Sequence, residues 1–275
     1  MKKLLTLLIA VLMSATCIFG LVSCKKETSV RDLDDILKDG KITVATNAEF
    51  APFESKEGEK YVGIDIEIAQ EIADYLGVEL VINNMDFESV VTSVQKAQSD
   101  LALAALTINE TRLNAIDFSD DYFGAAQFLI VKKTDTIFDS CTNKAEVDAI
   151  LATLSGKVGA QNATTGYYYV KGSSAFEFDG FSNLETVGYN TAAEAAMAVA
   201  NGQNILAVVD DEVANQIVQV NTDVKAIRIA LSTEKYGIGI NKQNTALKFV
   251  VNKVLAQMKE SGKLNQIIEK HTAEA

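Results

Sequence analysis

The chain has 275 residues, of which 48% are hydrophobic, enough for one large domain or two modest ones with sizeable cores. Its formal net charge of −12 argues against a nucleic-acid partner, because phosphate binding needs clustered lysine and arginine. A single histidine, His271, leaves almost no room for a histidine-based metal site or a Ser-His-Asp triad.

The N-terminus has the pattern of an export signal. A pair of lysines precedes an apolar run that ends near Gly20, and Ser23 then stands directly before Cys24. This order of charged, apolar and small residues predicts a secretory signal over residues 1–23. The cysteine after the small residue resembles a bacterial lipoprotein signal, in which lipid is attached to Cys24. The alternative is an uncleaved anchor helix, although the run is short for a span of roughly 20 residues.

The segment after Cys24 is polar and charged, and we expect residues 24–40 to be a tether between lipid and domain. Cys17 leaves with the signal and Cys24 takes the lipid, so Cys141 stays alone in the mature chain. An internal disulfide is therefore not expected, and Cys141 is interpreted as a small structural residue.

From residue 41 onward, short apolar runs alternate with segments of helical periodicity. The expected strands cover residues 41–46, 78–83, 100–106, 128–133, 157–162, 184–189, 205–211, 224–230 and 236–242. A capping box opens a helix at Thr191, and a long final helix begins near Leu247. This alternation predicts an α/β class, with mostly parallel sheets covered by helices. About nine strands with two clusters of crossovers favour two sheets over one.

Several polar or aromatic segments stand directly after these strands, where ligands bind in open α/β sheets. The first is ATNAEFAPFE, in which Asn47 is followed by Phe50 and Phe53. Two aromatic rings in such a loop could wall a small pocket, or they could pack into the core. Phe87 begins the helix after the second strand and is open to the same two interpretations.

A third segment, AALTINETR, carries an unusual basic residue. Arg112 is one of only three arginines among 25 basic residues, and its planar fork of donors matches a carboxylate. Ala104 and Ala105 would let backbone carbonyls be approached closely, and Thr107 offers a hydroxyl. The alternative is an exposed arginine paired with a nearby acid such as Asp117, which would contribute roughly 0–1 kcal/mol.

Two further segments could bind the ends of a zwitterion. In VVDDEVAN, Asp211 could receive an ammonium group, although both aspartates could also be solvated helix caps. In QNATTGYYY, Thr164 and Thr165 could place hydroxyls and N–H groups at a helix start, which favours an anion. Arg112 and Asp211 are far apart in the sequence, which fits opposite walls of a cleft.

These stretches resemble the bacterial extracellular solute-binding proteins for polar amino acids, which deliver ligands to ATP-binding-cassette importers. The matching stretches are KITVATNAEFAPFE, YVGIDIEIAQEIADYLG, LALAALTINETRLNAIDFSDDYF, GKVGAQNATT, VVDDEVA, YGIGINK and VNKVLAQMKESGKLNQIIEKH. They follow the family's order across almost the whole mature chain.

The resemblance implies a two-lobed periplasmic-binding-protein fold, in which each lobe is a mostly parallel sheet flanked by helices. Lobe 1 would take residues 41–122 and 239–271, and lobe 2 would take residues 127–234. Two hinge strands, about 123–126 and 235–238, would let the lobes close over a ligand.

The resemblance also implies roles for individual residues. The carboxylate-clamping arginine falls on Arg112, the hydroxy residue of the same loop on Thr107, and the ammonium-binding aspartate on Asp211. The remaining ligand-binding positions fall on Asn47, Phe50, Phe87, Ala104, Ala105, Gln161, Thr164 and Thr165. Phe50 and Phe87 are the aromatic lid positions, and Thr164 and Thr165 are the hydroxyl pair of the second lobe.

Three departures from the family pattern bear on the ligand. Many members have aspartate where this chain has Asn47, so a cationic ligand is less favoured and a neutral polar amino acid slightly more so. Glycine commonly stands in place of Ala163, and serine or glycine in place of Ala104 or Ala105. The alanines therefore leave pocket size and backbone approach open.

The leading hypothesis is a lipid-anchored binding protein on the extracytoplasmic face of the cell membrane, without catalysis, cofactor or metal. Its expected partners are a free amino acid, a membrane permease and the membrane itself, and it is expected to be a monomer. One alternative is a periplasmic dehydratase of the cyclohexadienyl type, which would need a general acid or base such as Glu49, Asp86 or Lys171. Another is an amino-acid sensor that acts through a partner.

Overall fold

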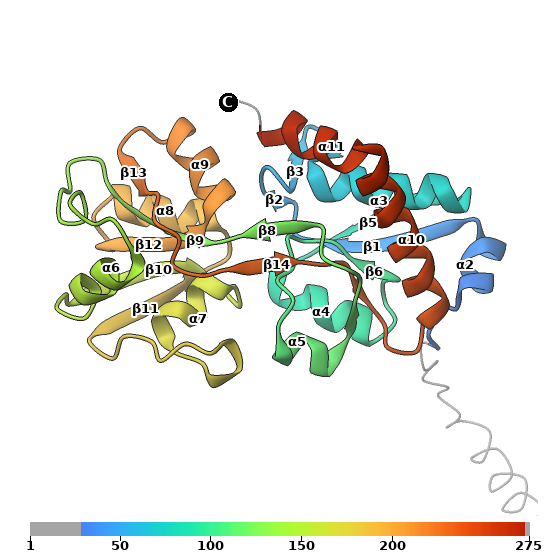
Figure 1. Cartoon of the computed structure of the whole chain (residues 1–275), viewed down its shortest axis with the longest axis horizontal. Coiled ribbons are helices and arrows are strands. Elements are labelled where there is room, and N and C mark those ends of the chain that lie inside the picture. Colours follow the sequence, from blue (N-terminus) through green and yellow to red (C-terminus); the bar gives the residue numbers. More distant parts are fainter. Residues whose placement is uncertain (1–28, 273–275) are drawn as a thin grey trace, which may run out of the picture.

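The computed structural model describes residues 29–272, so the expected signal and Cys24 lie outside the described residues. Two lobes lie side by side and are joined by two strands that cross between them (Figure 1). Each lobe is built around a five-stranded sheet with helices packed on it. The α/β class predicted from the sequence is confirmed.

The first lobe, on the right in Figure 1, contains a mixed sheet in the order β5-β1-β6-β15-β7. Its strands are β1 (Lys41–Thr46), β5 (Glu79–Asn84), β6 (Leu101–Ala102), β7 (Asp117–Phe118) and β15 (Gly239–Ile240). Its helices are α2 (Leu33–Asp39), α3 (Ile64–Leu76), α4 (Phe87–Gln95), α5 (Glu110–Ala115), α10 (Thr245–Ser261) and α11 (Lys263–Thr272). β1 runs parallel to β5 and β6, whereas β15 is antiparallel to β6 and β7.

Helix α3 illustrates how the sequence determines a packed helix. Ile64, Ile68 and Ile72 recur at helical spacing and are fully buried in the core of the first lobe. Burial of each isoleucine contributes roughly 2 kcal/mol before the entropy of folding is counted. Gly77 ends the helix with a φ of 69°, a left-handed conformation that glycine adopts without a steric penalty.

Helix α2 occupies the end of the segment expected to be a tether. Asp32 accepts a hydrogen bond from the backbone of Asp35, whose side chain accepts one from Asp32 in return. Ile36 is fully buried in the core of the first lobe. Leu33 packs against the same core, and Arg31 pairs with Asp100 at 2.7 Å. The segment that was expected to be a tether up to residue 40 therefore ends in a helix that is packed on the first lobe.

The second lobe contains a sheet in the order β11-β10-β12-β9-β13. Its strands are β9 (Gln127–Lys132), β10 (Gly156–Gln161), β11 (Leu184–Tyr189), β12 (Leu206–Asp210) and β13 (Val224–Ile227). Its helices are α6 (Lys144–Leu151), α7 (Thr165–Lys171), α8 (Ala192–Ala200) and α9 (Asp211–Val220), with a 3-10 turn η1 (Ser174–Phe176) after α7. β10 is parallel to β11 and β12, and the carboxyl ends of β10 and β12 lead into α7 and α9.

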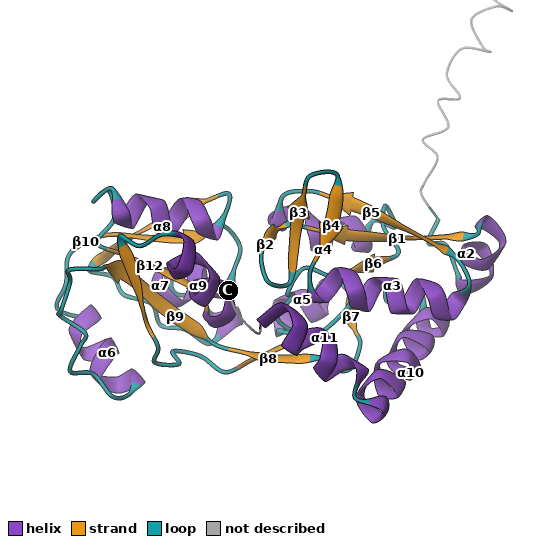
Figure 2. Cartoon of the chain, turned by 90° about the horizontal axis from the view of Figure 1, so that it is seen from above, coloured by secondary structure: helices purple, strands orange, loops and turns teal. Residues whose placement is uncertain are grey.

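Two antiparallel strands, β8 (Phe123–Ala125) and β14 (Glu234–Tyr236), connect the lobes. Tyr236 is fully buried there, with its ring 5.2 Å from that of Phe53 and 5.8 Å from that of Phe123. Figure 2 shows β8 running between the lobes. These two strands lie where the resemblance places the hinge, at about residues 123–126 and 235–238.

Some expected strands differ in extent from the observed ones. The expected strand over residues 100–106 is shorter in the structure, where β6 covers only Leu101–Ala102 and Ala105 has a left-handed φ of 45°. The expected strand over residues 236–242 is divided between β14 and β15, because the chain leaves the hinge and enters the first sheet. The sequence pattern also does not predict a small antiparallel sheet formed by β2 (Glu49–Phe50), β3 (Glu54–Glu57) and β4 (Lys60–Val62).

None of the helices between residues 29 and 272 has the length and apolar character of a membrane span.

Candidate functional site

Arg112 lies at the junction of the two lobes, with only 6% of its surface exposed. It sits on the short helix α5, which Asn109 caps by accepting a hydrogen bond from the Arg112 N–H at 2.9 Å. Its Nη1 donates to the Thr107 carbonyl at 2.8 Å, and its Nη2 donates to the Ala163 carbonyl of the second lobe at 3.2 Å. The alternative of an exposed surface ion pair is wrong, since Arg112 is buried and Asp117 pairs with Lys248 at 3.2 Å.

Arg112 is desolvated by burial but keeps its positive charge. Burial lowers the pKa of the guanidinium to about 10, while the nearby carboxylates of Glu234 and Asp210 oppose that shift. Arg112 therefore stays protonated at neutral pH. Two carbonyl contacts engage only part of its five N–H donors. A carboxylate would pair with the remaining donors and offset the cost of burying the charge.

Hydroxyl groups from both lobes meet beside this arginine. The Oγ1 atoms of Thr107 and Thr165 are 3.3 Å apart, and Thr107 Oγ1 donates to Glu234 Oε2 at 2.7 Å. Because Thr107 has one proton and gives it to Glu234, its oxygen can only accept from other groups. Glu234 also accepts from Gln127 Nε2 at 3.0 Å and from Ser232 Oγ at 2.6 Å.

Only one member of the expected threonine pair takes part in this interlobe contact. Thr164 caps α7 instead: its hydroxyl donates to the Gln161 carbonyl at 2.7 Å and accepts from the Tyr167 N–H at 3.3 Å. Its side chain is thus occupied in holding the start of the helix, and this leaves Thr165 as the threonine that faces the first lobe.

Asn47 and Gln161 form a second contact between the lobes. Gln161 Nε2 donates to Asn47 Oδ1 at 2.9 Å and to the Asn190 carbonyl at 2.9 Å. Asn47 Nδ2 donates to the Met85 carbonyl at 3.0 Å. Within residues 29–272, Gln161 Oε1 is buried and has no hydrogen-bond partner. A buried acceptor of this kind is costly unless a donor reaches it.

The two adjacent aspartates have different environments. Asp210 is buried and accepts a hydrogen bond from the Tyr236 hydroxyl, so solvated capping is wrong for this residue. Burial, and then the neighbouring Glu234, raise its pKa to about 7. Asp211 is half-buried at the start of α9, where its Oδ1 accepts from the Glu212 N–H at 2.9 Å. Burial raises the pKa of Asp211 to about 6.

The remaining predicted positions divide into two groups. Ala104 and Ala105 are buried beside the arginine loop, and the Ala105 N–H donates to Asp65 Oδ2 at 2.8 Å. The Phe87 ring lies 5.3 Å from the Arg112 Cζ. Phe50 is also buried, but its ring lies against that of Phe53, at 6.4 Å between centroids. The structure therefore brings Phe87 to Arg112 and packs Phe50 into an aromatic cluster near the hinge.

The sequence does not predict Glu234 and Phe176, although both lie at this site. Glu234 comes two residues before Tyr236 in the hinge strand, and Phe176 belongs to η1, with its ring 5.9 Å from the Arg112 Cζ. Neither follows a strand of an open sheet, which was the signal used for the other residues.

The dehydratase alternative would need a general acid or base at the site. The three candidates for that role, Glu49, Asp86 and Lys171, are exposed.

Two α/β lobes with a thin hinge, a buried cation and facing hydroxyls define a protein that binds a small ligand between its lobes. The chain belongs to the bacterial extracellular solute-binding proteins, family 3, whose family model matches residues 42–274.

Proteins of known ligand and solved structure are similar over most of the chain. It is 29% identical to the arginine-binding extracellular protein ArtP of Bacillus subtilis, over 98% of both chains. It is 30% identical to the substrate-binding protein AbpA of Streptococcus pneumoniae bound to L-arginine, with a TM-score of 0.77, covering 87% of this chain and 98% of that one. It is 34% identical to an ancestral arginine-binding protein bound to glutamine, with a TM-score of 0.73, covering 86% and 99%.

Proposed function

We propose that this chain is the substrate-binding protein of an ATP-binding-cassette importer and captures a free amino acid between its lobes. The observation that carries the proposal is Arg112, a buried cation that contacts carbonyls of both lobes and keeps donors for a carboxylate. Membership of the solute-binding family and the names of its relatives support amino acids as the ligand class. The closed, loaded form would then dock onto the membrane permease.

The amino acid would be held by its two charged ends. Its carboxylate would pair with Arg112 and, by displacing the hydrogen bond between Thr165 and Thr107, accept from the Thr165 hydroxyl. Its ammonium group would donate to Asp211 and to Thr107 Oγ1, which can only accept because its proton goes to Glu234. Charged hydrogen bonds of this kind contribute about 1.5–3 kcal/mol each. Phe87 would shield the arginine end from water, and Ala104 and Ala105 would line the pocket, while Phe50 would support it from the aromatic cluster near Phe53.

The side chain of the ligand would reach the amide pair of Asn47 and Gln161. Both groups are neutral, and Gln161 Oε1 is an acceptor that needs a donor. A side chain with an uncharged N–H donor, such as the amide of glutamine, fits that chemistry best. Arginine also carries N–H donors, but Asn47 supplies no charge to balance its cation, so we expect glutamine to bind more tightly.

Attachment to the membrane would come from Cys24. The export pattern over residues 1–23 supports cleavage before this cysteine, and two or more acyl chains would anchor the protein stably on the extracytoplasmic face. The protein would then work as a tethered monomer. A Cys24→Ala variant should lose the incorporation of labelled fatty acid that the wild-type protein shows in cells; a wild type that incorporates none would argue against lipid attachment.

Titration calorimetry across the twenty common L-amino acids tests the proposed function. At least one of them should bind with a Kd well below 100 µM, and L-glutamine should rank among the tightest. Failure of all twenty to bind more tightly than about 100 µM, equivalent to roughly −5.5 kcal/mol, would overturn the proposal.

A further inference from the structure

The guanidinium of Arg112 contacts aromatic rings from both lobes. Its Cζ lies 5.3 Å from the ring centroid of Phe87 in the first lobe and 5.9 Å from that of Phe176 in the second. Attraction between a cation and an aromatic ring strengthens where water is excluded. Because Phe176 and Arg112 belong to different lobes, this second contact depends on how closely the lobes approach each other.

The Phe176 ring also packs within the second lobe. It stacks on Tyr168 of α7, with centroids 4.4 Å apart and planes inclined by 23°. The loop around it is closed by two backbone hydrogen bonds: Ser173 N–H donates to Phe178 O at 2.8 Å, and Phe178 N–H donates to Ser173 O at 3.1 Å. Glu177 takes a left-handed φ of 58° to make the turn. A ring that is already fixed loses little freedom when it meets Arg112.

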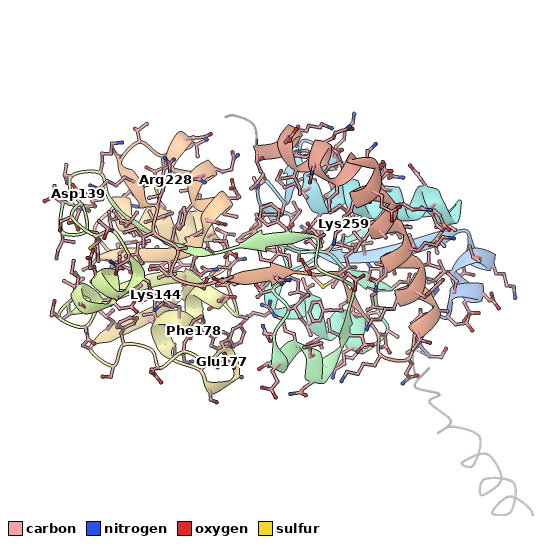
Figure 3. All side chains as sticks on the ribbon, in the orientation of Figure 1. Asp139, Lys144, Glu177, Phe178, Arg228 and Lys259 are labelled. Carbon is pink, nitrogen blue, oxygen red and sulfur yellow. The ribbon has the colours of Figure 1, made fainter. Side chains whose placement is uncertain are left out.

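Helix α7 joins this loop to the hydroxyl contact between the lobes. The helix begins at Thr165, whose hydroxyl faces Thr107, and Tyr168 lies one turn later under the Phe176 ring. Figure 3 shows Glu177 and Phe178 of the same loop at the edge of the second lobe that faces the first. A cavity of about 390 Å³ lies between this loop, the segment before α5 and the start of β14. Helix α7 and the neighbouring turn η1 thus present Thr165 and Phe176 to the first lobe.

We propose that Phe176 is a positioning residue that completes the Arg112 site from the second lobe. When the lobes close, its ring covers the guanidinium, restricts its orientation and keeps water from the pair that Arg112 forms with a ligand carboxylate. Phe176 therefore slows release of the ligand, because the second lobe must withdraw the ring before the carboxylate can be hydrated. This proposal rests on the proposed function and adds a residue that the sequence pattern does not indicate.

Stopped-flow measurements of binding and release, with L-glutamine and L-arginine as probes, test this role. Phe176→Ala should release the better-bound probe about tenfold faster, while the association rate changes less than threefold. Phe176→Tyr should stay within about twofold of the wild type, because it keeps the aromatic face, whereas Phe176→Leu should release about threefold faster. Phe249→Ala is the control: Phe249 is 71% exposed on α10, and its loss should change neither rate.

A double-mutant cycle separates positioning of Arg112 from general support of the loop. In an Arg112→Lys background, Phe176→Ala should weaken binding less than threefold, because the planar group that the ring holds is gone. An equal loss in both backgrounds would overturn the proposal, as would wild-type release rates in Phe176→Ala and Phe176→Leu. If the wild type binds neither probe nor any other amino acid, the proposed function fails instead, which keeps the two failures distinct.

Discussion

Two neighbouring regions at the lobe junction bury charge in opposite ways. One holds a single cation, Arg112, between aromatic rings and backbone carbonyls. The other, around Tyr236 and the hinge, gathers four buried acids, which are Glu54, Asp65, Asp210 and Glu234. Burial lowers the pKa of Arg112 only to about 10, but it raises those of Asp65 and Asp210 to about 7.

The same loss of water therefore has different consequences in the two regions. The arginine begins so far above neutral pH that desolvation leaves its charge intact, so it can bind an anion across the physiological range. The aspartates begin far below neutral pH and are brought close to it, so their charge depends on conditions. Glu54 shows the same effect, since burial and then Asp65 and Asp210 raise its pKa well above the usual value.

The arginine region should show the largest response to substitution. Arg112→Lys keeps the charge but loses the planar fork, and we expect amino-acid affinity to fall by about 2 kcal/mol or more, roughly 30-fold. Calorimetry measures the change. Arg228→Lys is the matched control, because Arg228 bonds Asn215 on the exposed face of the second lobe. Equal affinities for the wild type and Arg112→Lys would remove the carboxylate role from Arg112.

The acidic side of the cleft should respond next, through Asp211. Asp211→Asn should weaken binding of the amino acid by about 1.5 kcal/mol, roughly tenfold, because a charged acceptor for the ammonium becomes neutral. Its pKa is raised to about 6, so protonation should also weaken wild-type binding as the pH falls through that value. The variant should lose this pH dependence, and Glu212→Gln should retain it. A pH profile shared by Asp211→Asn and the wild type would contradict the assignment.

Substitution of a buried acid should increase the stability of the protein, whereas the substitutions at Arg112 and Asp211 should weaken ligand binding. The folded protein binds a proton at Asp210 more tightly than the unfolded chain does, since its pKa rises from 3.8 to about 7. Its contribution to stability is therefore complete below about pH 4 and is lost as the pH rises through about 7. Asp210→Asn keeps an acceptor for the Tyr236 hydroxyl, and we expect it to raise the free energy of unfolding at pH 7.5 by about 1 kcal/mol.

Thermal unfolding of the ligand-free protein between pH 4 and 8 tests the predicted contribution of Asp210 to stability. The melting temperature of Asp210→Asn should fall less steeply with rising pH than that of the wild type. Asp179→Asn, at an exposed position, should follow the wild-type curve. A variant that is less stable than the wild type at pH 7.5 would show that ionised Asp210 stabilises the hinge.

The smallest effect should come from the amide pair. Asn47→Asp places a charge where the side chain of the ligand is expected, so the affinity ratio of L-arginine to L-glutamine should rise about fivefold, roughly 1 kcal/mol. Competition of the two amino acids for the same protein measures the ratio directly. A ratio that does not move would place the side chain of the ligand away from Asn47.

Features that depend on residues close together in the sequence could be predicted from it, and contacts between distant residues mostly could not. The α/β class follows from local periodicity, and the position of Arg112 after a buried strand indicates that it faces a cleft. The bond between Asn47 and Gln161 joins residues 114 positions apart. Asn47 directly follows β1, whereas Gln161 is the last residue of β10 and was expected at the site only from the family resemblance. Placement at or directly after the end of a strand thus indicates residues that meet between the lobes, but it does not pair them.

Contacts that depend on the hinge could not be found in this way. Thr107 reaches Glu234 because the chain returns through β14, 127 residues later, and nothing in the stretch STEKYG marks that acid. Phe176 meets Arg112 only through the approach of the lobes. Thr164 caps α7, whereas Thr165 faces the first lobe. Which of the two adjacent threonines takes which role depends on the residue at which the helix begins, and the sequence does not fix that residue.

The central claim is that Arg112 binds the carboxylate of a free amino acid. It is tested most directly by comparing, for the wild-type protein, the Kd of L-glutamine with that of its α-carboxamide, in which the carboxylate becomes a neutral amide. We predict that the amide binds at least 100-fold more weakly and that Arg112→Lys narrows this difference. Equal affinities for the two compounds would contradict the account.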